Sequence, residues 1–218
     1  MSLLKALRRH PITERQRALT HRVAALLLAY PDERLLADLP LLREAATELP
    51  DPPRTDLLGV IEWLAVTPPS ELTERYVETF DLRRRSCLHL TYYAHGDTRN
   101  RGAALLAFSN AYRRSGFVLA EDELPDHLCV VLEFAATVDH DSGARLLHRY
   151  RAGLELLRLA LRDEGSPYLG AVTAVDTTLP PPNNRLNDTV ARLITEGPPG
   201  EEVGLAPFAP PETGRVHS

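Results

Sequence analysis

The stretch LHRYRAGLELLRLALRDEGSP, residues 147–167, decides the fold class that the sequence predicts. Its large apolar residues recur at alternating intervals of three and four: Leu147, Tyr150, Leu154, Leu157 and Leu161. That spacing places them on one face of an α-helix, whereas a half-buried strand would need strict alternation. The Gly165-Ser166-Pro167 sequence then ends the pattern. The stretch therefore predicts a long amphipathic helix with one buried face.

The same spacing recurs in the rest of the chain. The other stripes are Leu19, Val23, Leu26 and Tyr30; Leu57, Ile61 and Leu64; Leu72, Tyr76 and Phe80; and Leu105, Phe108 and Tyr112. No segment shows a convincing alternation of β-branched residues, and only residues 171–178 are ambiguous. We therefore predict an all-α fold, a single-domain multi-helix bundle, with Tyr76 and Phe80 in its core.

Proline, glycine and short polar residues predict where the helices begin and end. Pro40 is expected to split residues 34–49 into two short helices, because proline lacks the N–H group and clashes inside a helix. The other expected signals are N-caps at Thr67 or Ser70 and at Asp97, a helix end at Gly116, a first-turn proline at Pro125 and a turn over residues 139–143.

The character of the chain changes at Leu179. Prolines at positions 180–182, 198, 199, 207, 210 and 211 leave no long periodic face to bury. We predict a flexible N-terminus over residues 1–13, an all-helical domain over 14–178 and a flexible Pro-rich tail over 179–218. A short helix at 188–195 is the one candidate element in that tail.

Composition argues against several classes of function. A net charge of −5 argues against a nucleic-acid partner, because nucleic-acid-binding surfaces are basic. The longest apolar run, residues 23–29, is too short to span a bilayer, and no signal-peptide cleavage site follows it. Cys87 and Cys129 form neither a disulfide framework nor a metal knuckle. We expect a cytoplasmic protein that does not insert into the membrane.

The sequence carries no recognised catalytic motif: no Gly-rich phosphate loop, no GxSxG and no HExxH. Cys87 with His89 and His127 with Cys129 are zinc-ligand types, but residues two apart on a helix point about 200° from each other. Three arginines before Cys87 would lower the pKa of its thiol, yet no motif places a base beside it. We expect no enzyme activity, no metal and no cofactor.

Residues 76–136 differ from the ends of the chain in composition, because aromatic residues, histidines and paired charges are concentrated there. Aromatic rings with polar tips, next to arginines and acids, supply rigid apolar contact area and directional polar partners. This composition is typical of a surface that grips a peptide.

Two motifs in this region carry a family resemblance. They are His95-Gly96-Asp97-Thr98-Arg99-x-Arg101-Gly102 and Glu123-Leu124-Pro125-Asp126-His127-Leu128. In this order and at this separation they closely resemble the NarJ-type (delta subunit) chaperones of respiratory nitrate reductase, within the wider TorD/DmsD group of molybdoenzyme maturation proteins. The resemblance runs from about residue 14 to residue 174.

The resemblance implies an all-helical, TorD-like fold and a cytoplasmic chaperone with one client. That client would be the apo catalytic alpha subunit of nitrate reductase, bound through its N-terminal segment while molybdenum cofactor is inserted and before membrane assembly. The machinery that delivers molybdenum cofactor is a further implied partner. A generic helical adaptor and a metal-dependent hydrolase are the alternative functions.

Seven residues are candidates for peptide binding: Tyr92, His95, Arg99, Arg101, Pro125, Asp126 and His127. Pro125, Asp126 and His127 match the element that lies near the peptide groove in relatives, although Asp126 is equally suited to stabilising a helix N-terminus. Arg99 and Arg101 pair either with client acids or with Asp97 and Asp126. At least one of Tyr92 and Tyr93 is expected in the core.

The expected mode of binding is an amphipathic helix of the client in a groove between helices. Glu121, Asp122, Glu123 and Asp126 would attract a basic peptide and make its association sensitive to salt. His127 would add a pH dependence near neutrality.

Overall fold

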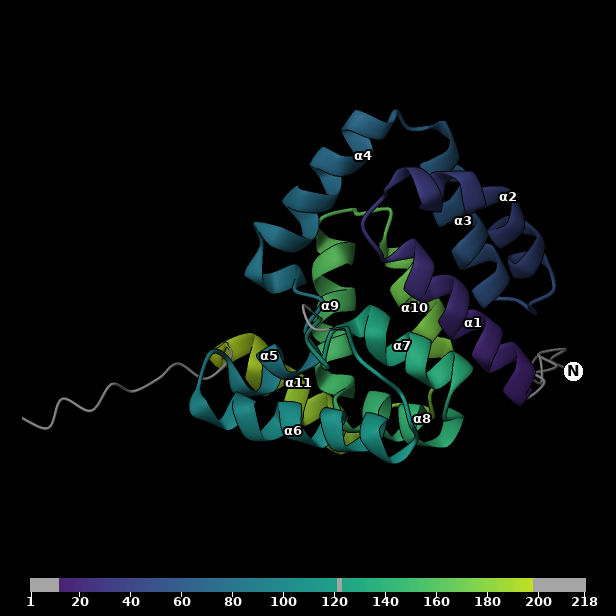
Figure 1. Ribbon diagram of the computed structural model, residues 1–218. Helices are drawn as coiled ribbons and strands as arrows, with labels where there is room; N and C mark the ends of the chain where they lie inside the picture. The colour runs from purple at the N-terminus through teal and green to yellow at the C-terminus, as the bar shows by residue number, and fades with distance from the viewer. Residues whose placement is uncertain (1–11, 121–122, 198–218) are drawn as a thin grey trace, which may run out of the picture.

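The computed structural model describes residues 12–120 and 123–197, and most of them are helical (Figure 1). The α-helices are α1 (Glu14–Leu27), α2 (Glu33–Thr47), α3 (Pro53–Val66), α4 (Pro69–Tyr76), α5 (Leu90–His95), α6 (Arg99–Arg114), α7 (Leu128–Thr137), α8 (His140–Arg149), α9 (Arg151–Asp163), α10 (Leu169–Thr177) and α11 (Asn184–Glu196). A π-helical turn η1 (Val77–Asp81) and a 3₁₀ turn η2 (Arg84–Ser86) lie between α4 and α5. In these two ranges no strand forms, which confirms the all-α prediction.

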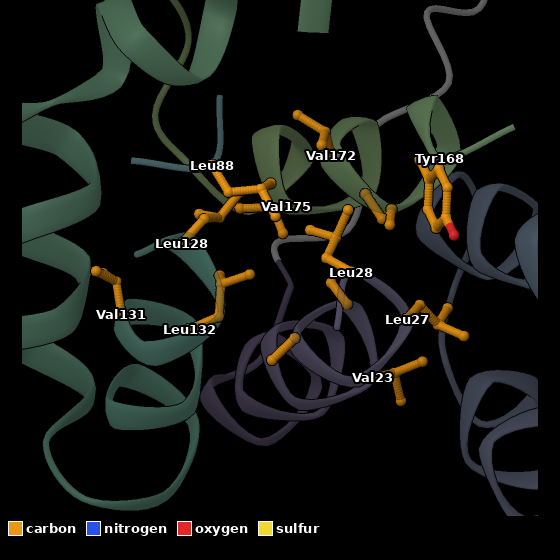
Figure 2. Close-up of a cluster of buried hydrophobic side chains, with 14 of the residues drawn as sticks. Val23, Leu27, Leu28, Leu88, Leu128, Val131, Leu132, Tyr168, Val172 and Val175 are labelled. Carbon is orange, nitrogen blue, oxygen red and sulfur yellow. The ribbon is translucent and has the colours of Figure 1, made fainter. Parts of the chain in front are cut away.

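Three helices that are distant in sequence build the centre of the core. α1 packs against both α7 and α10, and α10 also packs against α3. Figure 2 shows the side chains that meet there: Leu27 and Leu28 at the end of α1, Leu128 and Leu132 from α7, and Val172 and Val175 from α10. All six are fully buried, and burying such a side chain stabilises a fold by about 1.5–3 kcal/mol.

A second apolar centre forms around Tyr168, at the start of α10. The Tyr168 ring is buried, and it meets the rings of Trp63, Tyr76 and Phe80 at centroid distances of 5.0, 6.0 and 4.9 Å. Tyr76 and Phe80 are both buried, as the sequence predicts. This aromatic cluster joins α4 and η1 to the helices α3 and α10.

The stripe that decides the fold class is buried along its whole length, but it belongs to two helices. α8 ends at Arg149 and α9 begins at Arg151, so the single long helix that the sequence predicts is interrupted at Tyr150. The Tyr150 ring is buried and lies 4.9 Å from the ring of Phe108 in α6. Gly165, with a φ of 63°, follows the end of α9 as predicted.

Pro40 does not divide its helix, which corrects the sequence-based prediction. α2 runs through it without a break. Leu35 and Leu39 come before Pro40 in α2 and Leu42 comes after it, and all three are buried. Because α2 packs against α1 and α3 and has buried leucines on both sides of Pro40, tertiary packing compensates for the hydrogen bond that the proline removes.

Several predicted helix boundaries are also wrong. Residues 139–143 are not a turn: Asp139 is the N-cap of α8 and accepts a 2.8 Å hydrogen bond from the Ser142 N–H. Neither Thr67 nor Ser70 caps α4, whose N-cap is Pro68. Asp97 does not cap α6, whose N-cap is Thr98. The ambiguous residues 171–178 fall mostly within α10, and Gly116, with a φ of 71°, follows the end of α6 as expected.

The segment predicted as a flexible tail contains a packed helix. α11 begins four residues before the short helix expected at 188–195, and it packs against α9 through Val190 and Leu193. Residues 198–218 and 1–11 lie outside the described ranges, so the predicted flexibility there stays a prediction. Among the described helices, none has the length and apolar character needed to cross a membrane.

A buried histidine of α1, His21, is hydrogen-bonded to Thr178 at the end of α10. The Thr178 hydroxyl donates to the Val175 carbonyl (2.7 Å), so the His21 Nε2–H donates to the Thr178 oxygen (2.8 Å). The Nδ1 atom of His21 is buried without a hydrogen-bond partner. Burial, and then the charges of Arg17 and His140, lower the pKa of His21 to about 3.

This histidine is expected to make the protein less stable in acid. An unfolded chain binds a proton at His21 near pH 6.5, whereas the folded protein resists it until about pH 3. The free energy of unfolding should therefore fall as the pH drops through this window, by up to about 1.4 kcal/mol per pH unit from this group. Urea unfolding between pH 7 and pH 5 measures the slope.

His21→Gln keeps an amide N–H for Thr178. It should remove the contribution of one proton from the slope of unfolding free energy against pH. The exposed His148→Gln is the matched control and should keep the wild-type slope. An unchanged slope in His21→Gln would show that His21 does not contribute to the acid sensitivity.

Candidate functional site

The two family-like motifs meet through a short backbone bridge. The chain that enters α5 and the chain that enters α7 run antiparallel past each other at His89 and His127. The Leu90 N–H donates to the Asp126 carbonyl (3.1 Å), and the Leu128 N–H donates to the Leu88 carbonyl (2.8 Å). The N-termini of α5 and α7 are therefore fixed side by side, although 37 residues lie between His89 and His127 in the sequence.

The carboxylate of Asp126 is the centre of a buried polar network at this bridge. Its side chain is 0% exposed. Oδ2 accepts hydrogen bonds from the Thr91 N–H (3.2 Å) and the Thr91 hydroxyl (2.5 Å), and Oδ1 lies 3.2 Å from His89 Nδ1. Arg101 lies 3.7 Å from Oδ2 and also donates to the Thr91 hydroxyl oxygen (3.2 Å) and to Asp97 (3.3 Å).

Asp126 therefore stabilises a helix N-terminus, but not that of the helix that follows it in sequence. Thr91 lies in the first turn of α5, where backbone N–H groups lack partners inside the helix. The carboxylate supplies the acceptor from the neighbouring segment and places a negative charge at the positive end of α5. Burial raises the pKa of Asp126, but hydrogen bonds from His89 and Thr91 outweigh it and hold the pKa below its usual value.

The residues on either side of Asp126 are also held by the fold. Pro125 is buried, and its carbonyl accepts a 2.6 Å hydrogen bond from the Tyr112 hydroxyl. The sequence predicts Pro125 in the first turn of the following helix. This is wrong, because α7 begins three residues later, at Leu128. The His127 ring lies 5.1 Å from the His89 ring in an edge-to-face arrangement.

The hypothesis that His127 titrates near neutrality is wrong. Burial, and then the nearby His89, lower the pKa of His127 to about 4, against the opposing effect of Asp126. The ring is therefore neutral at physiological pH, and a pH switch near pH 7 cannot use it.

The side of α5 that carries Tyr92 and Tyr93 borders a hollow. Its volume is about 500 Å³, and residues of η2, α5, α9 and α11 line it. Tyr92 and Tyr93 line it from α5, Leu156 and Leu159 from α9, and Leu193 from α11. We call it the α9 hollow. Tyr92 is 9% exposed, and the Tyr93 hydroxyl is held inward by bonds to the carbonyls of Arg85 (3.0 Å) and Cys87 (2.9 Å).

The charge around the α9 hollow differs from the acidic surface that the sequence predicts. Its lining includes Arg84, Arg85 and Arg162, with Asp163 paired to Arg162 at 2.8 Å. Asp126 cannot attract a peptide from solution, because its carboxylate is buried and lies beside Arg101. Glu123 is exposed, and residues 121 and 122 lie outside the described ranges.

The seven candidate residues thus fall into three places. Asp126 and Arg101 belong to the buried network, and Pro125 and His127 flank it. Tyr92 belongs to the α9 hollow. His95 and Arg99 lie at the turn between α5 and α6, where the His95 carbonyl accepts a 2.7 Å hydrogen bond from Thr98 and Arg99 is exposed. Of the alternatives for Arg101, the structure places it beside Asp97 and Asp126.

The α9 side of the hollow was missed at the sequence level, although a signal existed. Leu156 and Leu159 are not part of the stripe from Leu147 to Leu161, so they form a second apolar face of the same helix. A helix that is apolar on two faces has two packing partners or a docking surface. Only the first face entered the prediction.

The two thiols are held in their protonated form. Burial raises the pKa of Cys87, whose sulfur accepts a hydrogen bond from the His89 N–H at 3.4 Å. Burial also raises the pKa of Cys129 to about 12. Within the described residues, no three side chains of His, Cys, Asp or Glu lie close enough together to form a metal site.

The fold of this chain is that of a solved maturation protein. A crystal structure described as a putative redox enzyme maturation protein from Archaeoglobus fulgidus aligns with a TM-score of 0.56, over 73% of this chain and 92% of that one. The two sequences are 20% identical, so this likeness establishes the fold. It supports the all-helical fold class that the sequence predicts.

The chain belongs to the nitrate reductase delta subunit family, whose model matches residues 42–174. It is 45% identical over 156 residues to the nitrate reductase-like protein NarX of Mycobacterium tuberculosis, which covers 71% of this chain but only 23% of NarX. It is 36% identical to the probable nitrate reductase molybdenum cofactor assembly chaperone NarJ of Bacillus subtilis, over 72% of this chain and 84% of that protein. The NarJ chaperone of Escherichia coli is 31% identical over 149 residues. The predicted NarJ-type resemblance is confirmed.

Proposed function

We propose that this protein is a cytoplasmic assembly chaperone for nitrate reductase, without enzyme activity of its own. The observation that carries the proposal is the family match over residues 42–174, together with relatives named as molybdenum cofactor assembly chaperones. The client is the apo catalytic alpha subunit, held through its N-terminal segment while the client receives its molybdenum cofactor. Contact with the cofactor delivery machinery is part of the same proposal.

The α9 hollow is the proposed seat of the client segment. It combines aromatic side chains of α5 with leucines of α9, which suits the apolar face of an amphipathic helix. Ligand pockets of about 300–1,000 Å³ are typical of specific sites, and this hollow lies in that range. The buried network around Asp126 has a positioning role here, because it fixes the start of α5 and hence Tyr92 and Tyr93.

Isothermal titration with a synthetic peptide tests this proposal. The peptide copies the N-terminal segment of the nitrate reductase alpha subunit encoded in the same genome, and a scrambled peptide is the control. We expect a dissociation constant in the micromolar range or tighter for the first peptide only. Equal binding of both peptides would favour a generic adaptor, and no binding of either would contradict the proposed client.

A matched pair of variants locates the site. Leu159→Gln places an amide in the α9 hollow and should weaken peptide binding about tenfold, which corresponds to about 1.4 kcal/mol. Leu41→Gln makes the same change at an exposed leucine on α2 and should leave binding unchanged. If Leu159→Gln bound the peptide as tightly as the wild-type protein, the seat would lie elsewhere.

A further inference from the structure

α11 lies at the edge of the bundle, and α9 is its main packing partner. It lies in the lower part of Figure 1, and Leu193 and Ile194 line the same hollow as Tyr92 and Tyr93 of α5. Only Val190 and Leu193 of its side chains are buried, whereas Ile194 is 59% exposed although it borders the α9 hollow. The family model ends at residue 174, so α11 lies outside the segment that it matches.

The chain is fixed just before α11 begins. Arg151 is 3% exposed, donates to Asp176 at 2.8 Å and also donates to the Pro180 carbonyl. This clamp holds the end of α10 and the first of three consecutive prolines in place. Release of α11 from α9 would leave this clamp intact, because Arg151, Asp176 and Pro180 all precede α11 in the chain.

α11 has the form of the ligand that the hollow is proposed to accept. Leu186, Val190 and Leu193 recur at intervals of four and three, which makes one apolar stripe on a short helix. Leu193 and Ile194 lie along the same hollow as Leu156 and Leu159 of α9. The apolar surface of α9 thus extends beneath α11, and α11 covers part of it.

We propose that α11 is an intramolecular stand-in for the client helix, which displaces it from α9 on binding. The inference rests on the proposed function and adds its regulation. α9 offers one apolar face to a short amphipathic helix. The protein's own C-terminal helix covers that face when no client is present. The apparent affinity for the client is then lowered by the fraction of molecules in which α11 is docked.

Loosening α11 in the full-length protein tests this proposal. The double variant Val190→Gln, Leu193→Gln removes the two buried contacts of α11 and should bind the alpha-subunit peptide about fivefold or more tightly than the wild-type protein. Ala191→Gln, on the exposed side of α11, is the matched control and should bind like the wild-type protein. Hydrogen exchange provides a second readout: saturating peptide should speed exchange of the α11 amides in the wild-type protein.

Each other result has a definite meaning. If the double variant bound the peptide no more tightly than the wild-type protein, α11 would not be a competitor and the inference would be overturned; weaker binding would show in addition that α11 is a wall of the site. Peptide binding with α11 still protected from exchange would also overturn it, with the proposed function intact. If neither protein bound the peptide, the proposed client would fail and the inference with it.

Discussion

Asp126→Ala is expected to lower the free energy of unfolding by about 3–5 kcal/mol, because it removes the buried negative charge that its hydrogen-bonding and ion-pair partners face. The carboxylate accepts two hydrogen bonds from Thr91 and lies beside His89 and Arg101. Without it, the first turn of α5 loses its acceptor and the Arg101 guanidinium faces an empty, partly buried space. Chemical denaturation followed by circular dichroism measures the loss.

Asp97→Ala is the matched control, because it removes the other carboxylate that pairs with Arg101. The Asp97 side chain is 65% exposed, so its removal should cost at most about 1 kcal/mol. Equal losses in the two variants would contradict the structural role of Asp126. The comparison also bears on function, because a peptide-binding defect in Asp126→Ala would reflect the lost fold of α5 unless the variant proves as stable as Asp97→Ala.

Gly143→Ala is expected to destabilise the protein by about 3 kcal/mol, at the upper end of what one added methyl group costs in a packed core. A Cβ atom at Gly143 would lie 2.3 Å from the Cβ and 2.5 Å from the Cα of Ala135, so α8 and α7 would have to separate. Backbone atoms cannot move aside as the end of a flexible side chain can. Thermal unfolding of the purified variant measures the effect.

Gly59→Ala makes the same substitution where nothing lies within 4 Å of the new atom. Gly59 is exposed within α3, so alanine should stabilise the helix by about 0.5–1 kcal/mol. The two variants should therefore shift the melting temperature in opposite directions. A gain of stability in Gly143→Ala would mean that α7 and α8 do not cross as closely as described.

The sequence predicts the helices well and their boundaries less well, for physical reasons that differ from place to place. Apolar periodicity is a property of one helix face, so Leu154, Leu157 and Leu161 predict α9 directly. The break falls at Tyr150, whose ring contacts Phe108 in α6, and periodicity within the segment does not report a partner from elsewhere. Pro40 is tolerated for the same kind of reason, since its helix is held by α1 and α3.

The candidate site was predicted in part. The two motifs identify the region, and the structure brings them together at His89 and His127. That Asp126 serves α5 and not α7 could not be foreseen, because the sequence gives no register between two segments separated by α6. The hollow escaped prediction because its walls come from η2, α5, α9 and α11, and only Tyr92 among its lining residues belonged to the predicted site.

The bridge and the Asp126 network have an evolutionary consequence. Arg101, Asp126 and His127 belong to the two motifs and also lie where the starts of α5 and α7 are held side by side, so a descendant that changed Asp126 would have to compensate for it elsewhere in the bridge. Leucines of the hollow such as Leu159 lie outside the motifs, so they can change without disturbing the bridge. The two motifs therefore identify the scaffold, and under the proposed function the choice of client depends on side chains outside them.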